Sequence, residues 1–488
     1  MWRLGRRSYR SCGSRLTDVI RTPRFSLFLA AFALSPLGFV NAQDIPDNID
    51  GFDFDFDSAN FDDDLFAQPQ SNTPEWLEPF TFKLSQQLFA QVNEHSVSRA
   101  DGNTERKNAA IENSRFSLLA RYQNPFAAGW LLQASAQAKV YWPGDYEYRA
   151  NDDRIDTEFR LNELFVQRST GENSVKLGAQ TVVWGENIGN SVLDVINTSE
   201  FRDLTIIDIE DARLNQWLLV WDRFIGNHQI SSFVNLYPEF NPPPVRGSPF
   251  FFEPAFNLTD YRREKALFEI GSQMRWSLAG SDISIMGAYL YENQLSYSPP
   301  ALGVGDAQST ANDYLLLGAS ANRAIGKLLL NLDIAYSHDI FVNVLVTPTN
   351  LNDAPYLATE TMNKLGATLG FEYAIDNDQS IMFGVAAEGK LSPDAQLASN
   401  AALLEDEVTG NALLRYSNNM RNGDLQLAVT LQSALDAGSV LGSVSLNYTL
   451  SNNLAVMGQV IATSAKKDSA LAVLDEDLRM GVTLSWTF

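Results

Sequence analysis

The chain has very few of the residues on which thiol and metal chemistry depend. Its one cysteine, Cys12, lies near the amino end, so the rest of the chain can form neither a disulfide nor a thiolate site. The only histidines are His95, His228 and His338, and only His338 has an aspartate, Asp339, beside it in the sequence. A catalytic triad or a shared metal site is not expected from so sparse a set, and we predict no enzyme, no metal and no cofactor.

Long apolar runs are also lacking. The one such run, Phe25–Val40, contains Pro36 and is shorter than the roughly 20 residues that a membrane-spanning helix needs. Several arginines precede it and the small-residue site Val40-Asn-Ala42 follows it, as in a secretory signal. We therefore predict a cleaved signal peptide at residues 1–42.

Positive charge is scarce, and the formal net charge of −23 argues against nucleic acid as a partner. The acidic, aromatic segment 43–79 contains the run Gly51–Asp57. Carboxylates in this segment have part of the spacing of a calcium loop, but Ser58 replaces the turn glycine. We predict instead either a flexible periplasmic tail or a segment that docks a periplasmic partner through residues 43–78. A third option is that the segment folds back as a plug into the domain that follows it.

What the chain does contain is period-2 alternation, clearest in its last eleven residues, Leu478–Phe488. Every second residue there is apolar, ending in Trp486 and Phe488, and the others are small, polar or, at Arg479, charged. Such a strand is typical of an outer-membrane β-barrel, with one face toward lipid and the other toward a lumen. A half-buried edge strand of a soluble β-protein is the alternative.

Connection lengths favour the barrel. From Phe80 onward, segments of about ten alternating residues are joined by short turns at one end and long connections at the other. The pattern predicts an all-β fold: a transmembrane antiparallel β-barrel of about 18 strands at residues 80–488, although 16 strands also fit. Its place would be the bacterial outer membrane, in contact with lipid and lipopolysaccharide. The long connections are expected at Gly185–Arg213, Pro238–Arg263, Gln294–Asn312, Ile340–Met362 and Ser392–Val408.

Basic side chains gather on the polar face of the first five strands. Because charge on the lipid face is costly, this face is expected to line the lumen. The wall would then concentrate anions, or the cations would only pair with acidic residues of the loops and later strands. The residues are Lys83, Arg115, Arg121, Lys139, Arg160, Arg168 and Lys176.

Alternation stops between Leu177 and Arg213, where helical spacing partly replaces it. An apolar insert after a strand could fold into the barrel and narrow it, or pack as an external loop. Its most distinctive residues, our candidates for the constriction, are Gln180, Trp184, Gly185, Glu186, Asp194 and Asn197.

The stretch Gly178-x-Gln-x-x-x-Trp-Gly-Glu186, with Leu193-Asp-Val-Ile-Asn197, resembles a porin-like family of proteobacterial outer-membrane proteins of unknown function. More distantly it is similar to the alginate-export porins, whose barrels have eighteen strands. The similarity is clearest over Phe159–Arg223. It implies an outer-membrane barrel and supplies no substrate.

Three functions fit these observations. The first is a diffusion channel for a small solute, with anions favoured by the basic wall. The second is transport of hydrophobic or lipid-like molecules, collected by the apolar stretches Pro249–Phe252 and Ile340–Val346. The third is a barrel that docks a periplasmic partner without transporting anything.

Overall fold

The structure, a computed structural model, describes residues 77–488 except for short gaps. The predicted signal peptide and nearly all of segment 43–79 therefore lie outside the described residues, as does Pro249–Phe252. Among the described residues, no helix is both long and apolar enough to cross a membrane. The gaps are residues 94, 99–103, 108–110, 144, 146–154, 187–190, 201, 203–212, 244–260, 264, 299–307, 349–354, 393–396, 398, 467–468 and 470.

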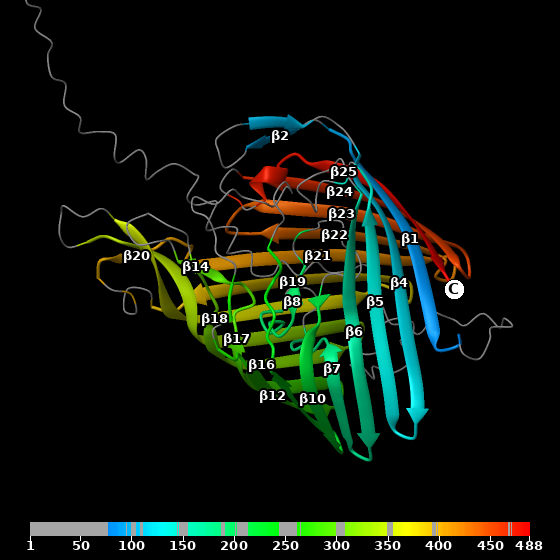
Figure 1. The fold of residues 1–488 in the computed structure, drawn as a ribbon, viewed down its shortest axis with the longest axis horizontal. Helices are drawn as coiled ribbons and strands as arrows, with labels where there is room; N and C mark the ends of the chain where they lie inside the picture. Colours follow the sequence, from blue (N-terminus) through cyan, green and yellow to red (C-terminus); the bar gives the residue numbers. More distant parts are fainter. Residues whose placement is uncertain are drawn as a thin grey trace, which may run out of the picture.

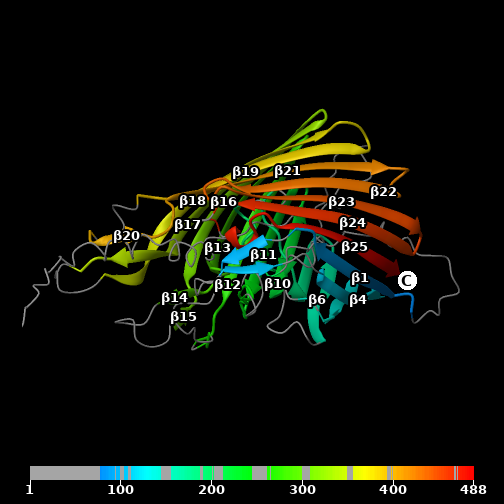
Figure 2. The same cartoon turned by 90° about the horizontal axis from the view of Figure 1, so that it is seen from above.

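Eighteen antiparallel strands form one closed ring, which confirms the predicted architecture and strand number (Figures 1 and 2). The first seven are β1 (Phe80–Gln91), β4 (Ile111–Ala127), β5 (Trp130–Tyr141), β6 (Asp156–Thr170), β7 (Asn173–Gln180), β10 (Gln216–Ile225) and β11 (His228–Asn235). The next six are β12 (Glu269–Leu278), β13 (Ser281–Tyr291), β16 (Asp313–Ile325), β17 (Leu328–Val346), β18 (Tyr356–Ala374) and β19 (Gln379–Lys390). The last five are β21 (Val408–Met420), β22 (Leu425–Ala434), β23 (Ser439–Ser451), β24 (Leu454–Ala465) and β25 (Leu478–Thr487).

The carboxy-terminal strand closes the ring as expected. β25 pairs with β1 from Lys83–Thr487 to Gln91–Arg479, so no barrel edge is left unpaired at this seam. Met480, Val482 and Leu484 point outward and are about half exposed, whereas Arg479 is buried on the inner face. An exposed apolar outer face around a closed ring is stable only in lipid, so the protein is a transmembrane barrel of the outer-membrane type.

Small elements decorate the long connections. The two-residue strands β8 (Thr198–Ser199) and β9 (Arg213–Leu214) pair with each other between β7 and β10. The others are β2 (His95–Ser98), β3 (Thr104–Lys107), β14 (Ser296–Ser298), β15 (Gln308–Thr310), β20 (Ala401–Leu403) and the 3-10 helix η2 (Ala472–Leu474).

Loop lengths are sorted between the two ends of the barrel, with one exception. Residues 435–438 form a short turn between β22 and β23 at the end that otherwise carries the long connections. We call the two ends the long-loop end and the short-turn end.

The connection expected at Ile340–Met362 was predicted too long. β17 and β18 continue past the barrel as a hairpin in which Ile340 pairs with Met362 and Val346 with Tyr356. A bulge after Ser337 shifts the side-chain alternation by one residue, so Ile340, Val342 and Val344 are buried. This stretch is therefore a packed strand and not an exposed apolar loop, which removes half of the basis for the hydrophobic-transport hypothesis.

Candidate functional site

The segment between β7 and β10 enters the barrel. Its apolar side chains Trp184, Val192, Leu193 and Ile196 belong to one buried cluster with inner-face residues of β10 to β19. We call the described part of this segment, residues 181–186 and 191–200, the insert. This placement agrees with the prediction that the apolar insert folds into the barrel. It does not agree with the alternative, in which the segment packs as an external loop.

Glycines on the inner face of the barrel make room for the insert. A Cβ atom added at any of three such glycines would lie between 2.4 and 3.1 Å from an insert or neighbouring side chain. Barrel and insert are therefore complementary in shape, and each seat accepts one apolar side chain. The seats are Gly271 for Trp184, Gly318 for Leu193, and Gly366 for Val192.

Polar anchors fix the insert from β17 and β18. Asp333, fully buried on the inner face of β17, accepts a hydrogen bond from the Glu186 amide (3.0 Å) and one from the Ser191 hydroxyl (2.7 Å). Thr368 on β18 accepts from the Val192 amide at 3.2 Å. Because the buried Asp333 carboxylate accepts hydrogen bonds from a backbone amide and a hydroxyl, it fixes both where the insert lies along the wall and how deep it lies in the barrel.

Glu186 adds a charged anchor. Its carboxylate accepts from Arg275 on β12 at 2.8 Å and from the side-chain amide of Asn322 on β16 at 2.9 Å. Burial raises the pKa of Glu186, and the nearby Arg275 guanidinium and the Asn322 hydrogen bond lower it in part. The residue thus ties the insert to two further strands.

The other signature residues stabilise the conformation of the insert itself. The Asn197 side chain accepts from the Val182 amide (3.0 Å) and donates to the Val182 carbonyl (2.8 Å), which bridges the two limbs of the insert. Asp194 forms an ion pair with Arg213 at 3.0 Å. Gln180 donates to the Leu218 carbonyl of β10 at 3.2 Å. Five of the six candidates thus belong to the insert, whereas Gln180 lies at the end of β7 and bonds to β10.

Two glycines of the signature have positive φ angles. At Gly185 (φ 97°) a Cβ would lie 2.1 Å from Ser191 Oγ, and at Gly178 (φ 142°) it would lie 2.0 Å from the Leu164 carbonyl oxygen. The contact at Gly178 is with backbone, which cannot rotate away. Only glycine fits at either position.

We expect Gly178→Ala to lower the free energy of unfolding by about 1–3 kcal/mol, because it adds strain at positive φ and a clash with β6. Thermal unfolding in detergent micelles measures this. The matched control is Gly458→Ala on β24, where a Cβ meets nothing within 4 Å. Equal stability of the two variants would contradict the assignment.

The predicted basic wall is present with one correction. Arg168 lies on the outer face, with its guanidinium 5.1 Å from the Trp130 ring centre. The cause is a bulge at residues 161–163 of β6, which reverses the alternation of the residues that follow. The six that lie on the inner face are Lys83, Arg115, Arg121, Lys139, Arg160 and Lys176.

Acidic groups accompany several of these cations, and Glu163 on the inner face of β6 interacts electrostatically with Arg121 and Lys176. Arg115 contacts Asp145 at 2.7 Å, and Arg160 contacts Glu200 of the insert at 2.7 Å. Arg115 and Arg160 therefore follow the alternative interpretation, in which the cations pair with carboxylates of the loops. Lys83, Arg121 and Lys139 are partly exposed to the interior.

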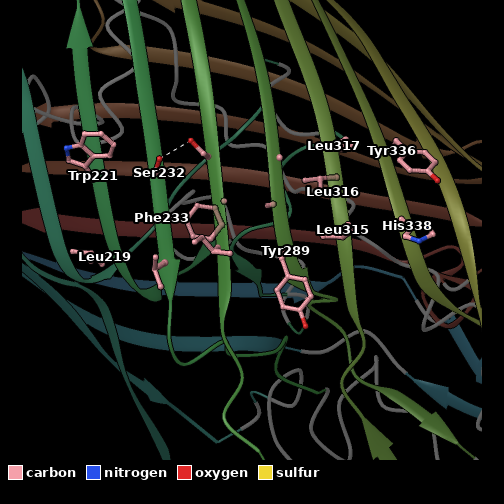
Figure 3. Close-up of a pocket in the computed structure, with 16 residues that line it drawn as sticks. Leu219, Trp221, Ser232, Phe233, Tyr289, Leu315, Leu316, Leu317, Tyr336 and His338 are labelled. Carbon is pink, nitrogen blue, oxygen red and sulfur yellow. Dashed lines mark hydrogen bonds between the residues drawn. The ribbon is translucent and has the colours of Figure 1, made fainter.

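A depression of about 710 Å³ lies on the outer face of β10 to β17 (Figure 3). Its small central residues include Ser232 and Ser272, whose hydroxyls bond each other at 2.9 Å, and larger side chains such as Trp221 and Leu317 flank them. His338 also lines it on the outer face and contacts Asp339 at 3.3 Å. This depression faces lipid and is separate from the bore.

Within the described residues, no group of three or more His, Cys, Asp or Glu side chains is placed to hold a metal ion. The residues that receive the insert, such as Thr368 and Gly318, could not be identified from the sequence. Their only signal was a glycine or threonine within an alternating strand. In a chain with 30 glycines, such a signal does not single out a seat.

Comparison with known proteins shows that the chain is similar in fold to several solved structures, at low sequence identity. No protein-family model and no curated protein matches the chain, so the predicted family resemblance stays a prediction. Among solved structures, the chain is similar to a BenF-like porin from Pseudomonas fluorescens Pf-5 (TM-score 0.48, 10% identity, 84% of this chain and 98% of that chain). Others are OccAB1 of Acinetobacter baumannii (TM-score 0.48, 8% identity, 84% and 96%) and the outer-membrane channel DcaP of the same organism (TM-score 0.39, 11% identity, 84% and 96%).

Proposed function

We propose that the protein is an outer-membrane channel for small polar solutes, narrowed by the insert and more permeable to anions than to cations. The observation that carries the proposal is that the insert packs on one side of the barrel. Its contacts run along β10 to β19, whereas polar inner-face side chains of β1, β4 and β5 remain partly exposed. A passage along this opposite wall would meet Lys83, Arg121 and Lys139.

The selectivity follows from the sign of that wall. Basic groups lining a narrow pore with low-dielectric surroundings raise the local concentration of anions and repel cations. The solute itself is not specified by this argument. The hydrophobic-transport alternative has no comparable support among the described residues, since Ile340–Val346 is packed inside the barrel extension.

Planar-bilayer recording of the purified full chain tests the proposal. In a salt gradient we expect discrete conductance steps and a reversal potential of the sign that anion preference gives. A barrel that stays closed at every voltage would overturn the channel, and cation preference would overturn the selectivity.

The double variant Lys83→Glu, Lys139→Glu should shift the reversal potential toward cation preference, because two positive charges on the passage become negative. Arg168→Glu is the matched control, since this charge lies on the outer face beside Trp130. A similar shift in the control would show that general surface charge, and not the inner wall, sets the selectivity.

A further inference from the structure

On the long-loop side of the insert, a cavity of about 210 Å³ lies between the insert and the inner face of the barrel. Insert residues Ser191, Asp194 and Val195 line one side, and residues at the ends of β16 to β21 line the other. At about 30 Å³ per water, this space holds about seven waters, or a solute of roughly that many non-hydrogen atoms.

Charges of both signs line this cavity. Lys364 contacts Glu388 at 3.0 Å, and Lys390 contacts Glu405 at 3.1 Å. Glu292 and Asp194 add two further carboxylates, of which Asp194 is paired with Arg213. Each of the four paired side chains is at least 9% and at most 27% exposed, so the pairs are sheltered but open to the cavity.

Backbone and amide donors hold the carboxylates in place. Glu292 accepts from the Phe341 amide (3.0 Å) and from Asn312 (2.8 Å). Glu405 accepts from the Asn343 amide (3.2 Å) and its side chain (3.3 Å). The charges are thus fixed before any solute arrives, which lowers the ordering cost of binding.

The arrangement of charge discriminates among solutes. An ammonium group has three donors and a carboxylate about four acceptor sites, so one ion pair leaves both partners with further capacity. A solute with one charge satisfies only one sign and must give up its own hydration. A solute with both charges can extend an ion pair at each end.

We propose that this cavity binds a small zwitterionic solute, with an ammonium and a carboxylate group on one short carbon skeleton. The inference rests on the proposed channel function, for which the cavity is a stopping point beside the insert. Its mixed charge distinguishes it from the basic wall across the barrel, which favours anions.

Calorimetric titration of the full chain in detergent tests the inference, with alanine as the zwitterion. Propionate and propylamine are probes of similar size with one charge each. We expect alanine to bind about tenfold or more tightly than either, since each lost charged contact is equivalent to about a factor of ten. Equal binding of the three probes would overturn the zwitterion, and no binding of alanine would overturn the site.

The double variant Lys364→Met, Glu388→Gln locates the site, because it removes both charges without leaving one unpaired. Alanine affinity should fall about tenfold or more while the conductance steps remain. Lys390→Met, Glu405→Gln is the second variant if the first fails to fold, and Lys327→Met at the short-turn end is the control. Unchanged alanine affinity in a folded double variant would show that the ion pairs are structural only.

The two proposals fail separately. Conductance without alanine binding would remove the zwitterion site and leave the channel. Alanine binding in a barrel that never conducts would leave the site and remove the channel.

Discussion

Replacing Asp333 by alanine should release the insert and give a larger single-channel conductance than the wild type. Asp333 is fully buried and accepts from the Glu186 amide and the Ser191 hydroxyl. Without it two buried donors lose their partner, at a cost of about 1–3 kcal/mol each, and the insert loses its central anchor. Bilayer recording measures the conductance, and thermal unfolding measures the stability.

Asp333→Asn is the matched control. Its amide oxygen can still accept from the Glu186 N–H, and the Ser191 hydroxyl can turn to accept from the amide nitrogen. We expect conductance close to wild type. If alanine and asparagine behave alike, Asp333 does not hold the insert through these hydrogen bonds.

Trp184→Ala should have the largest effect on stability. Trp184 is 2% exposed, packs edge-on against Phe233 at 5.5 Å between ring centres, and fills the seat at Gly271. Removing a buried indole costs about 3–5 kcal/mol, because the cavity left behind does not close fully. The temperature of unfolding in micelles should fall accordingly.

Trp217→Ala separates this effect from the loss of a tryptophan in general. Trp217 lies on β10 of the same barrel wall but points outward and is 46% exposed. Its loss changes contact with detergent or lipid and leaves the insert seated. A larger destabilisation from Trp217→Ala than from Trp184→Ala would contradict the packing described here.

Much of the barrel could be predicted because its physics is local. A strand with one face in lipid must alternate, so Leu478–Phe488 and its equivalents were visible along the chain. Bulges cannot be recognised in this way, since a strand with one extra residue has the same kinds of residues as a regular strand. The bulge at residues 161–163 placed Arg168 on the outer face, and the bulge after Ser337 turned Ile340, Val342 and Val344 inward.

The candidate site was also predictable only in part. Loss of alternation after Leu177 marked the insert, which contains five of the six candidate residues, while Gln180 lies on β7 and bonds the Leu218 carbonyl. Their partners could not be found, because Thr368 and Asn322 lie more than a hundred residues away from the groups they bind. Only closure of the barrel brings these residues together.

These distances along the chain also set an order of assembly. The contacts from Val192 to Thr368 and from Glu186 to Asp333 span 176 and 147 residues. Contacts between residues so far apart form late, because a long stretch of chain must be ordered first. The insert therefore reaches its seat only after β17 and β18 have joined the sheet. A closed barrel whose insert had not yet reached its seat would lack the contacts that fill its β10 to β19 side.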